Sequence, residues 1–253
     1  DSDVLQALYL PGLSMARFYD RCCAYFSSTV LAAAARGFGP FIQQLIALGD
    51  LAPRPAIRFV VNEELTPQDL KVLLETGDIK VLERQLLYRF KTPQEALVRD
   101  RLAMLAWLVA GEYLEIKVGI MRQGGGIVHG KFGIITDASQ DAVVFRGSGN
   151  ESGPALLYNY ENLEVSTSWQ DEEAYLFYSD QFNRIWEGNH PDVAIYSLPE
   201  AVRLELIKLA PQEAPYQEPG LTPNQARVAM QWQYLLEAPY LHDGVTACDA
   251  TAP

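Results

Sequence analysis

Two short segments near the middle of the 253-residue chain carry residues whose types and spacing suit chemistry on a phosphate group. The first, residues 128–137, reads as a strand, so that His129 and Lys131 should point to the same face. The second, residues 145–150, is a strand that ends in Gly-Ser-Gly-Asn, whose small residues let backbone, hydroxyl and amide groups approach a ligand closely. An imidazole, a cation and short donors that converge on one point predict a phosphate-binding site.

His-x-Lys followed by Gly-Ser-x-Asn resembles the signature of the phospholipase D superfamily, whose members cleave phosphodiesters without a metal ion. Further along the chain, Asn159-Tyr160-Glu161-Asn162 matches the Asn-x-Glu-Asn element of that family. One position departs from the family pattern. An Asp is usual five residues after the Lys, whereas this chain has Thr136 there and Asp137 one place later. The family's Asp is regarded as structural, so the departure weakens the match only slightly.

The resemblance implies a metal-independent, covalent mechanism with no cofactor. His129 would attack phosphorus in line and form a phosphohistidine, which divides one difficult displacement into two easier ones. Lys131 and Asn150 would hold the non-bridging oxygens, and Ser148 would add a hydroxyl. The sequence shows no cluster of His, Cys, Asp or Glu with the spacing of metal ligands, so no metal is expected.

Glu161 is the expected catalytic carboxylate, because it could accept a hydrogen bond from the other nitrogen of His129 and fix the tautomer. The alternatives are that Glu161 is an ordinary surface carboxylate, or that Glu164 orients the histidine instead. Ser27 follows a predicted strand, where a helix N-terminus could bind phosphate or the serine could simply cap the helix. The residues expected to contact substrate are Ser27, Gly147, Gly149 and Asn159.

The chain contains a single His-x-Lys motif, whereas members of the family commonly use two, one of which protonates the leaving oxygen. We therefore expect a two-fold homodimer in which His129 of both copies serves one shared active site.

The resemblance favours a DNA endonuclease, in a restriction or phage-defence system. Residues 24–28 are similar to an element of phospholipase-D-like domains attached to helicases, and residues 221–232 resemble the lead-in to a superfamily-2 helicase motor. A helicase domain or subunit is therefore a candidate partner. Two other functions compete with the nuclease: a phospholipid hydrolase or phosphatidyl transferase, and a catalytically silent module that docks nucleic acid or protein.

The elements that must position these residues alternate between strand and helix, which predicts an α/β fold: a phospholipase-D-like α/β/α sandwich with a mixed central sheet flanked by helices. Strands are predicted over 20–26, 57–62, 114–121, 127–135, 142–147 and 163–168, and helices over 29–48, 92–111, 171–188 and 199–209, with a further helix that starts at Thr66. Residues 1–18 read as a short lead-in with a helical turn after Pro11-Gly12. The phosphodiesterase domain should span 1–209, followed by a proline-rich linker over 210–222 and a helix and tail over 223–253.

The formal net charge of −12 opposes a broad nucleic-acid surface. Basic residues gather between Lys80 and Arg101, where they form either a local basic patch or a solvated helix pair of mixed charge. No apolar run reaches the roughly 18 residues of a membrane span. Three cysteines, of which Cys22 and Cys23 are adjacent, do not make a disulfide framework, and we expect a cytoplasmic protein without membrane contact.

Overall fold

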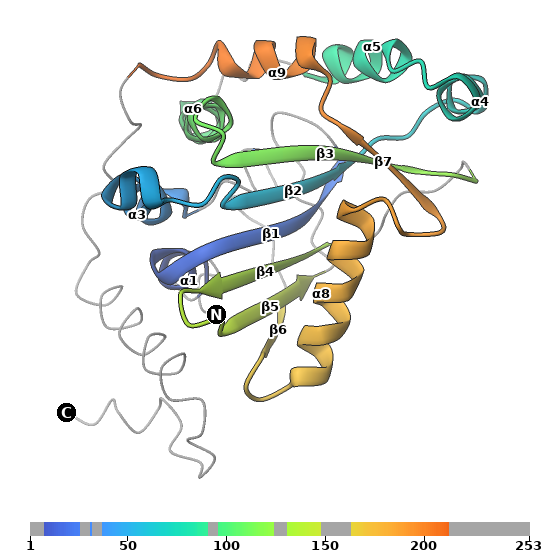
Figure 1. Ribbon diagram of the computed structural model, residues 1–253. Helices are drawn as coiled ribbons and strands as arrows, with labels where there is room; N and C mark the ends of the chain where they lie inside the picture. Colours follow the sequence, from blue (N-terminus) through green and yellow to red (C-terminus); the bar gives the residue numbers. More distant parts are fainter. Residues whose placement is uncertain are drawn as a thin grey trace, which may run out of the picture.

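A mixed seven-stranded sheet in the order β6-β5-β4-β1-β2-β3-β7 forms the centre of the computed structural model, which describes residues 8–25, 31, 37–90, 96–123, 131–147 and 163–212. Helices cover both faces of the sheet (Figure 1). The expected α/β fold with a mixed, helix-flanked sheet is confirmed. The strands are β1 Ala16–Tyr25, β2 Ile57–Asn62, β3 Leu114–Met121, β4 Phe132–Asp137, β5 Ala142–Gly147, β6 Leu163–Thr167 and β7 Val193–Ser197.

The strand directions bring particular strand ends to one edge of the sheet. β1, β2 and β3 are parallel, whereas β4, β5 and β6 follow one another in antiparallel pairs that start from β1. β7 is antiparallel to β3. The last residues of β1, β2, β3 and β5 and the first residues of β4, β6 and β7 therefore share one edge, which we call the motif edge.

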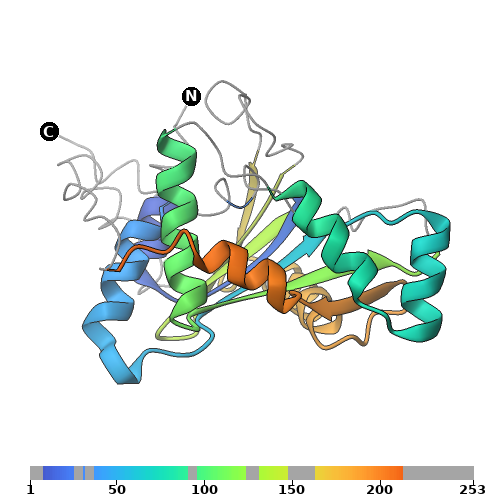
Figure 2. The same ribbon diagram turned by 90° about the horizontal axis from the view of Figure 1, so that it is seen from above.

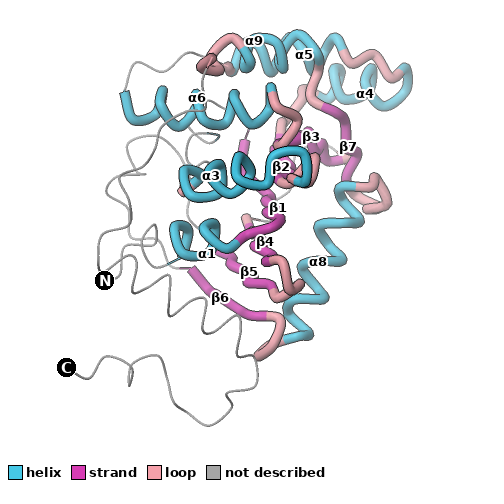
Figure 3. The backbone as a smooth tube through the Cα atoms, turned by 60° about the vertical axis from the view of Figure 1, so that its left-hand side comes forward, coloured by secondary structure: helices cyan, strands magenta, loops and turns pink. Residues whose placement is uncertain are grey.

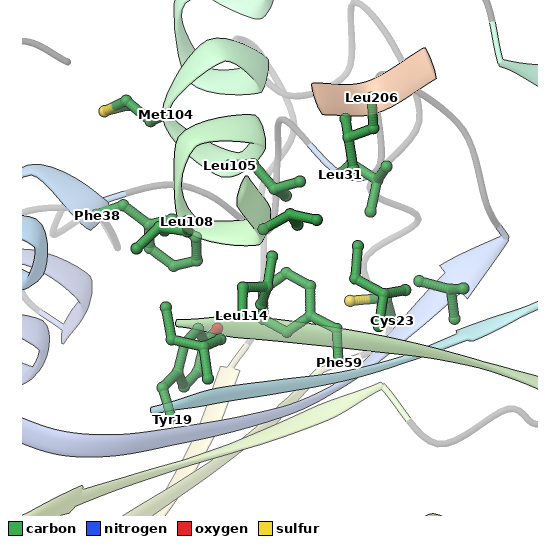
Figure 4. Close-up of a cluster of buried hydrophobic side chains, with 14 of the residues drawn as sticks. Tyr19, Cys23, Leu31, Phe38, Phe59, Met104, Leu105, Leu108, Leu114 and Leu206 are labelled. Atoms are coloured by element: carbon green, nitrogen blue, oxygen red, sulfur yellow. The ribbon is translucent and has the colours of Figure 1, made fainter. Parts of the chain in front are cut away.

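One face of the sheet carries most of the helices and the larger hydrophobic core. The helices on this side are α1 Leu10–Met15, α3 Phe38–Leu48, α4 Pro67–Thr76, α5 Lys80–Arg89, α6 Ala96–Ala110 and α9 Glu200–Ile207, with the short 3-10 helix η2 Gly49–Leu51. Figure 2 shows the helices from α3 to α6 and α9 spread above the strands. Leu105 and Leu108 of α6 lie over Tyr19, Phe59 and Leu114 of the sheet (Figure 4), and all five are nearly inaccessible to solvent.

The opposite face is covered, in the described part of the chain, by helix α8 (Glu172–Trp186; Figure 3). Asp171 caps α8 by accepting a hydrogen bond from the backbone nitrogen of Ala174, as the acidic start of this segment predicts. Phe182 and Trp186 pack against Phe132 and other strand residues in a second core cluster. Because successive residues of β1 alternate in direction, Cys22 faces α8 while Cys23 faces the larger core.

A pocket of about 510 Å³ on the α8 face contains charged groups that are bonded to one another. Arg58 donates from Nε and Nη2 to the two carboxylate oxygens of Asp20, at 2.6 Å each, and from Nη2 to Asn183 at 3.2 Å. Its guanidinium also lies 4.9 Å from the ring centroid of Phe182. A bidentate pair of this kind satisfies both charges, so these residues join the sheet to α8.

Three parts of the structure differ from the sequence-based expectation. The helical turn expected after Pro11-Gly12 is part of the buried helix α1, but β1 begins at Ala16, four residues before the predicted start at Asp20. The helix predicted over 29–48 is not continuous: Gly37 has a φ of 72°, and α3 begins after it. A Cβ atom at residue 37 would lie 3.1 Å from Cβ of Tyr9, so glycine is needed there for close packing as well. Strand β7 was not predicted.

Other features of the described chain agree with the sequence. Both Cys22 and Cys23 are buried free thiols, and burial raises the pKa of Cys22, so the thiolate needed for reactivity is disfavoured. No helix in the described ranges has the length and apolar character to cross a membrane. Apart from residues 210–212, the predicted linker over 210–222 and the helix and tail over 223–253 lie outside the described residues.

Gly133 of β4 should tolerate no side chain, because a Cβ atom built there would lie 2.3 Å from Cζ of Phe145. We expect Gly133→Ala to lower the free energy of unfolding, measured in urea, by about 1–3 kcal/mol through overpacking. Gly119→Ala in β3 is the matched control, because its Cβ would meet no atom closer than 3.4 Å. Equal stability of the two variants would contradict this packing argument.

Candidate active site at the motif edge

The start of β4 and the end of β5 are joined by a backbone hydrogen bond from N of Gly147 to O of Lys131, at 3.2 Å. Gly147 also pairs with Leu163, the first residue of β6. The three chain segments that carry the predicted motif are therefore anchored side by side at the motif edge. The structure brings together Lys131 and Gly147, the two predicted site residues that it describes. The other predicted site residues lie outside the described residues: Ser27, His129, Ser148, Gly149, Asn150, Asn159 and Glu161.

Lys131 belongs to the helix-rich face of the sheet. It directly precedes Phe132, whose ring packs against Tyr178 of α8 with centroids 4.9 Å apart. Because adjacent residues of a strand point to opposite faces, the side chain of Lys131 is directed away from α8. Lys131 is only partly exposed. The predicted cation therefore lies at the motif edge with part of its side chain withdrawn from water, where its charge is less screened.

Arg21 is a second cation near this edge, and the sequence analysis missed it. It is 4% exposed and lies opposite Gly133 of β4. Its guanidinium carbon is 4.8 Å from the ring centroid of Phe145 and 5.9 Å from that of Tyr9, an arrangement that stabilises a desolvated cation. The signal in the sequence was a basic residue directly before the small residues Cys22, Cys23 and Ala24 of a predicted strand. A buried positive charge favours an anion at the neighbouring surface.

Asn62 and Glu63 add buried polar groups at the end of β2. Nδ2 of Asn62 donates to the backbone oxygen of Cys23 at 2.8 Å, which ties this strand end to β1. The side chain of Glu63 is 0% exposed, and its Oε1 accepts from Nε of Arg89 at 2.8 Å and from N of Glu64 at 3.1 Å. Burial raises the pKa of Glu63, and the charge of Arg89 opposes this shift. The pattern in the sequence that could have identified these residues is a polar pair at the end of an apolar strand.

Glu164, the alternative orienter of the histidine, has its carboxylate held on the α8 face of the sheet. Nε of Arg146 donates to Oε2 of Glu164 at 2.6 Å, and Nη1 of the same arginine donates to the hydroxyl of Tyr178 in α8 at 2.7 Å. This arginine lowers the pKa of Glu164. Glu164 pairs directly with Arg146 across β5 and β6, so the strand register fixes both side chains on the α8 face.

Asp137 has a structural role at the opposite edge of the sheet. It is 6% exposed, and its Oδ1 accepts from the backbone nitrogens of Ser139 at 2.8 Å and Asp141 at 3.0 Å. These bonds close the turn between β4 and β5 in the manner of an Asx turn. The Asp of the motif can therefore stand one residue later than usual without a change at the motif edge.

Comparison with models of protein families returns no match for this chain, and a search of curated proteins returns none either. The resemblance to the phospholipase D superfamily thus depends on the motif residues themselves and on the strands that carry them. Among the described residues, no group of three or more His, Cys, Asp or Glu side chains is arranged to hold a metal ion.

The raised pKa of Glu63 has a measurable effect on stability. The folded state holds the Glu63 proton to a higher pH than the unfolded chain does, so the stability contribution of Glu63 falls as pH rises through the folded pKa. We expect the free energy of unfolding of the parent, minus that of Glu63→Gln, to decrease as pH increases upward from about 4. Urea unfolding at a series of pH values measures this difference.

The control for this experiment is Glu164→Gln, because the pKa of Glu164 is shifted in the opposite direction. The contribution of Glu164 is present above its unfolded pKa and is lost as pH falls, so its difference curve should slope the other way, with a small amplitude at this exposed site. A flat or rising curve for Glu63→Gln would show that its carboxylate is not held in a desolvated environment.

Proposed function

We propose that this protein is a metal-independent phosphodiesterase of the phospholipase D type, and that its substrate is DNA, which it cuts as an endonuclease. The observation that carries the proposal is the hydrogen bond between Gly147 and Lys131, together with the pairing of Gly147 and Leu163. These contacts anchor the His-x-Lys, Gly-Ser-x-Asn and Asn-x-Glu-Asn segments at one edge of the sheet. An active site formed by the three segments needs this common anchorage.

In the proposed reaction, an imidazole nitrogen of His129 attacks phosphorus, a P–N bond forms, and the bond to the leaving oxygen breaks. A general acid gives that oxygen its proton. Water then attacks the phosphohistidine and gives its proton to the deprotonated general acid, and the P–N bond breaks, which releases the second product and regenerates the imidazole. Lys131, Ser148 and Asn150 stabilise the charge on the non-bridging oxygens, and Glu161 holds the histidine in the reactive tautomer.

The remaining proposed contacts, from Ser27, Gly147, Gly149 and Asn159, bind the sugar-phosphate backbone through short polar groups that can approach it closely.

The charge near Lys131 supports an anionic substrate. Arg21 lies buried on the neighbouring strand, so two cations occupy this edge in a chain whose net charge is −12. Attraction of phosphate would then be local to the site.

A second copy of the chain supplies the general acid in this proposal, since each chain has one His-x-Lys motif. The two-fold homodimer would place His129 of both copies at one substrate phosphate. A helicase domain or subunit that feeds DNA to the site, within a restriction or phage-defence system, is the proposed biological setting. It derives from the helicase-associated resemblance alone.

Cleavage of DNA in the presence of EDTA tests the reaction. We expect the purified protein to cut DNA with the metal chelated, and His129→Ala to lower the rate by at least about 10³-fold, because the nucleophile is lost. His190→Ala is the control: this histidine is partly exposed, and its Nδ1 accepts from the backbone nitrogen of Asp192. Absence of cleavage by the parent protein, or equal rates for the parent and His129→Ala, would refute the assignment.

Sharing of the site between two copies predicts a dominant loss of activity. Co-expression of differently tagged parent and His129→Ala chains yields mixed dimers, which carry one histidine where the reaction needs two. We expect these mixed dimers to cut DNA far more slowly than half the rate of the parent dimer, whereas mixed dimers with His190→Ala keep the full rate. Half the parent rate would indicate independent sites, and a monomer in sedimentation would eliminate the shared site.

A further inference from the structure

The last turn of α5 presents an exposed aromatic ring beside an arginine. Val81, Leu82 and Leu86 of α5 are buried, whereas the consecutive residues Tyr88 and Arg89 of its last turn are exposed. Tyr88 is 75% exposed, and the side chain of Arg89 is 38% exposed. The ring of Tyr88 is therefore largely accessible to solvent beside the guanidinium of Arg89.

Arg89 is held at the motif edge by a buried carboxylate. Glu63, which accepts from Nε of Arg89 at 2.8 Å, is the residue directly after β2, and its side chain is 0% exposed. Burying a carboxylate is costly unless its charge is compensated, so replacing this pair by apolar residues would often be neutral or stabilising. What the pair does achieve is to fix the position of one cation, because the flexible Arg89 side chain is anchored through its Nε.

The strand register relates this cation to the catalytic segment. Cys22 of β1 lies opposite Val60 on one side and Phe132 on the other, so β1 alone separates the end of β2 from the start of β4. Neighbouring strands are about 4.8 Å apart, which places the backbone of Lys131 roughly 10 Å from the end of β2. By alternation from Phe132, which packs on the α8 side, the side chain of Lys131 is expected on the face that carries α5. The last turn of α5 therefore lies on the approach to the proposed active site.

We propose that the last turn of α5 binds an unpaired nucleic-acid strand next to the proposed active site, with Tyr88 stacked on a base and Arg89 bound to a phosphate. This inference rests on the proposed function and specifies its substrate as DNA that is single-stranded near the cut. A base can stack on Tyr88 only when it is unpaired, and stacking of this kind tolerates any base.

The overall charge favours a single strand over a duplex. A protein that holds a duplex through its backbone neutralises many phosphates and needs a broad basic surface, whereas this chain has a net charge of −12. One anchored cation beside one exposed ring is the combination that single-strand binding uses. Arg89 and Tyr88 provide this combination within one helical turn.

The experiment measures the affinity of the full chain, carrying His129→Ala to prevent cleavage, for a fluorescent single-stranded oligonucleotide and for the corresponding duplex. We expect Tyr88→Ala to weaken single-strand binding about tenfold or more and to leave duplex binding unchanged. Removal of the ion pair by Glu63→Gln with Arg89→Gln should reduce the slope of log affinity against log salt for the single strand by about 0.7, the value for one phosphate.

Two matched controls show whether the loss of any exposed aromatic ring or any exposed ion pair weakens DNA binding. Phe177→Ala removes an aromatic ring that is 56% exposed on α8, on the opposite face of the sheet. Glu200→Gln with Arg203→Gln removes an exposed ion pair from α9. Both controls should leave affinity and salt slope unchanged. The paired replacement at positions 63 and 89 avoids leaving the buried Glu63 carboxylate without Arg89, and Tyr88 is too exposed for its replacement to disturb the core.

The outcomes distinguish this inference from the proposed function. If single-strand affinity and salt slope are the same in the parent and the Tyr88 and Glu63/Arg89 variants, the inference is wrong, while His129-dependent cleavage would still support the nuclease. Equal losses on duplex and single strand would also overturn the assignment to an unpaired strand. If the parent binds neither DNA and cuts neither, both proposals fail.

Discussion

The antiparallel pairing of β4 with β5 is the constraint on which the candidate site depends. It joins the His-x-Lys and Gly-Ser-x-Asn segments through the bond between Lys131 and Gly147. A slip of one residue in this pairing would turn Lys131 to the α8 face and separate it from the other site residues. The register is secured at both ends of the hairpin: Phe145 packs directly over Gly133 near the motif edge, and Asp137 closes the turn at the opposite edge.

The two faces of the sheet use polar groups in different ways. On the α8 face, each charged side chain that bridges strand and helix is bonded to a neighbour: Arg58 to Asp20, and Arg146 to Glu164 and Tyr178. Lys117 likewise donates to the backbone oxygen of Trp186 and lies 4.2 Å from its ring centroid. These contacts attach α8 to the sheet. Because the charged groups in the pocket lined by Asp20 and Arg58 already bind one another, the pocket needs no ligand to satisfy them.

On the other face, polar groups gather where the strands end at the motif edge. Arg21 is buried among aromatic rings, and Glu63 is buried directly after β2 and paired with Arg89 of α5. Asn62 is buried at the same edge on the α8 side, next to Val60. Buried polar groups of this kind contribute little to the stability of a core and limit where neighbouring chain segments can lie. Their location at the edge that holds Lys131 is consistent with a site that binds an anion in a protein of net negative charge.

The sequence by itself determined the α/β class, the bounds of β2, β3 and β5, and the start of α4 at Thr66. Those features depend on local patterns, namely continuous apolar runs and capping residues, which adjacent residues specify. It also predicted Lys131 and Gly147 as site residues, because motif spacing is local too. Only the tertiary structure decided the break at Gly37, the pairing of β7 with β3, the face of Glu164 and the burial of Arg21 and Glu63. Each of these depends on contact between segments far apart in the chain, which no local pattern encodes.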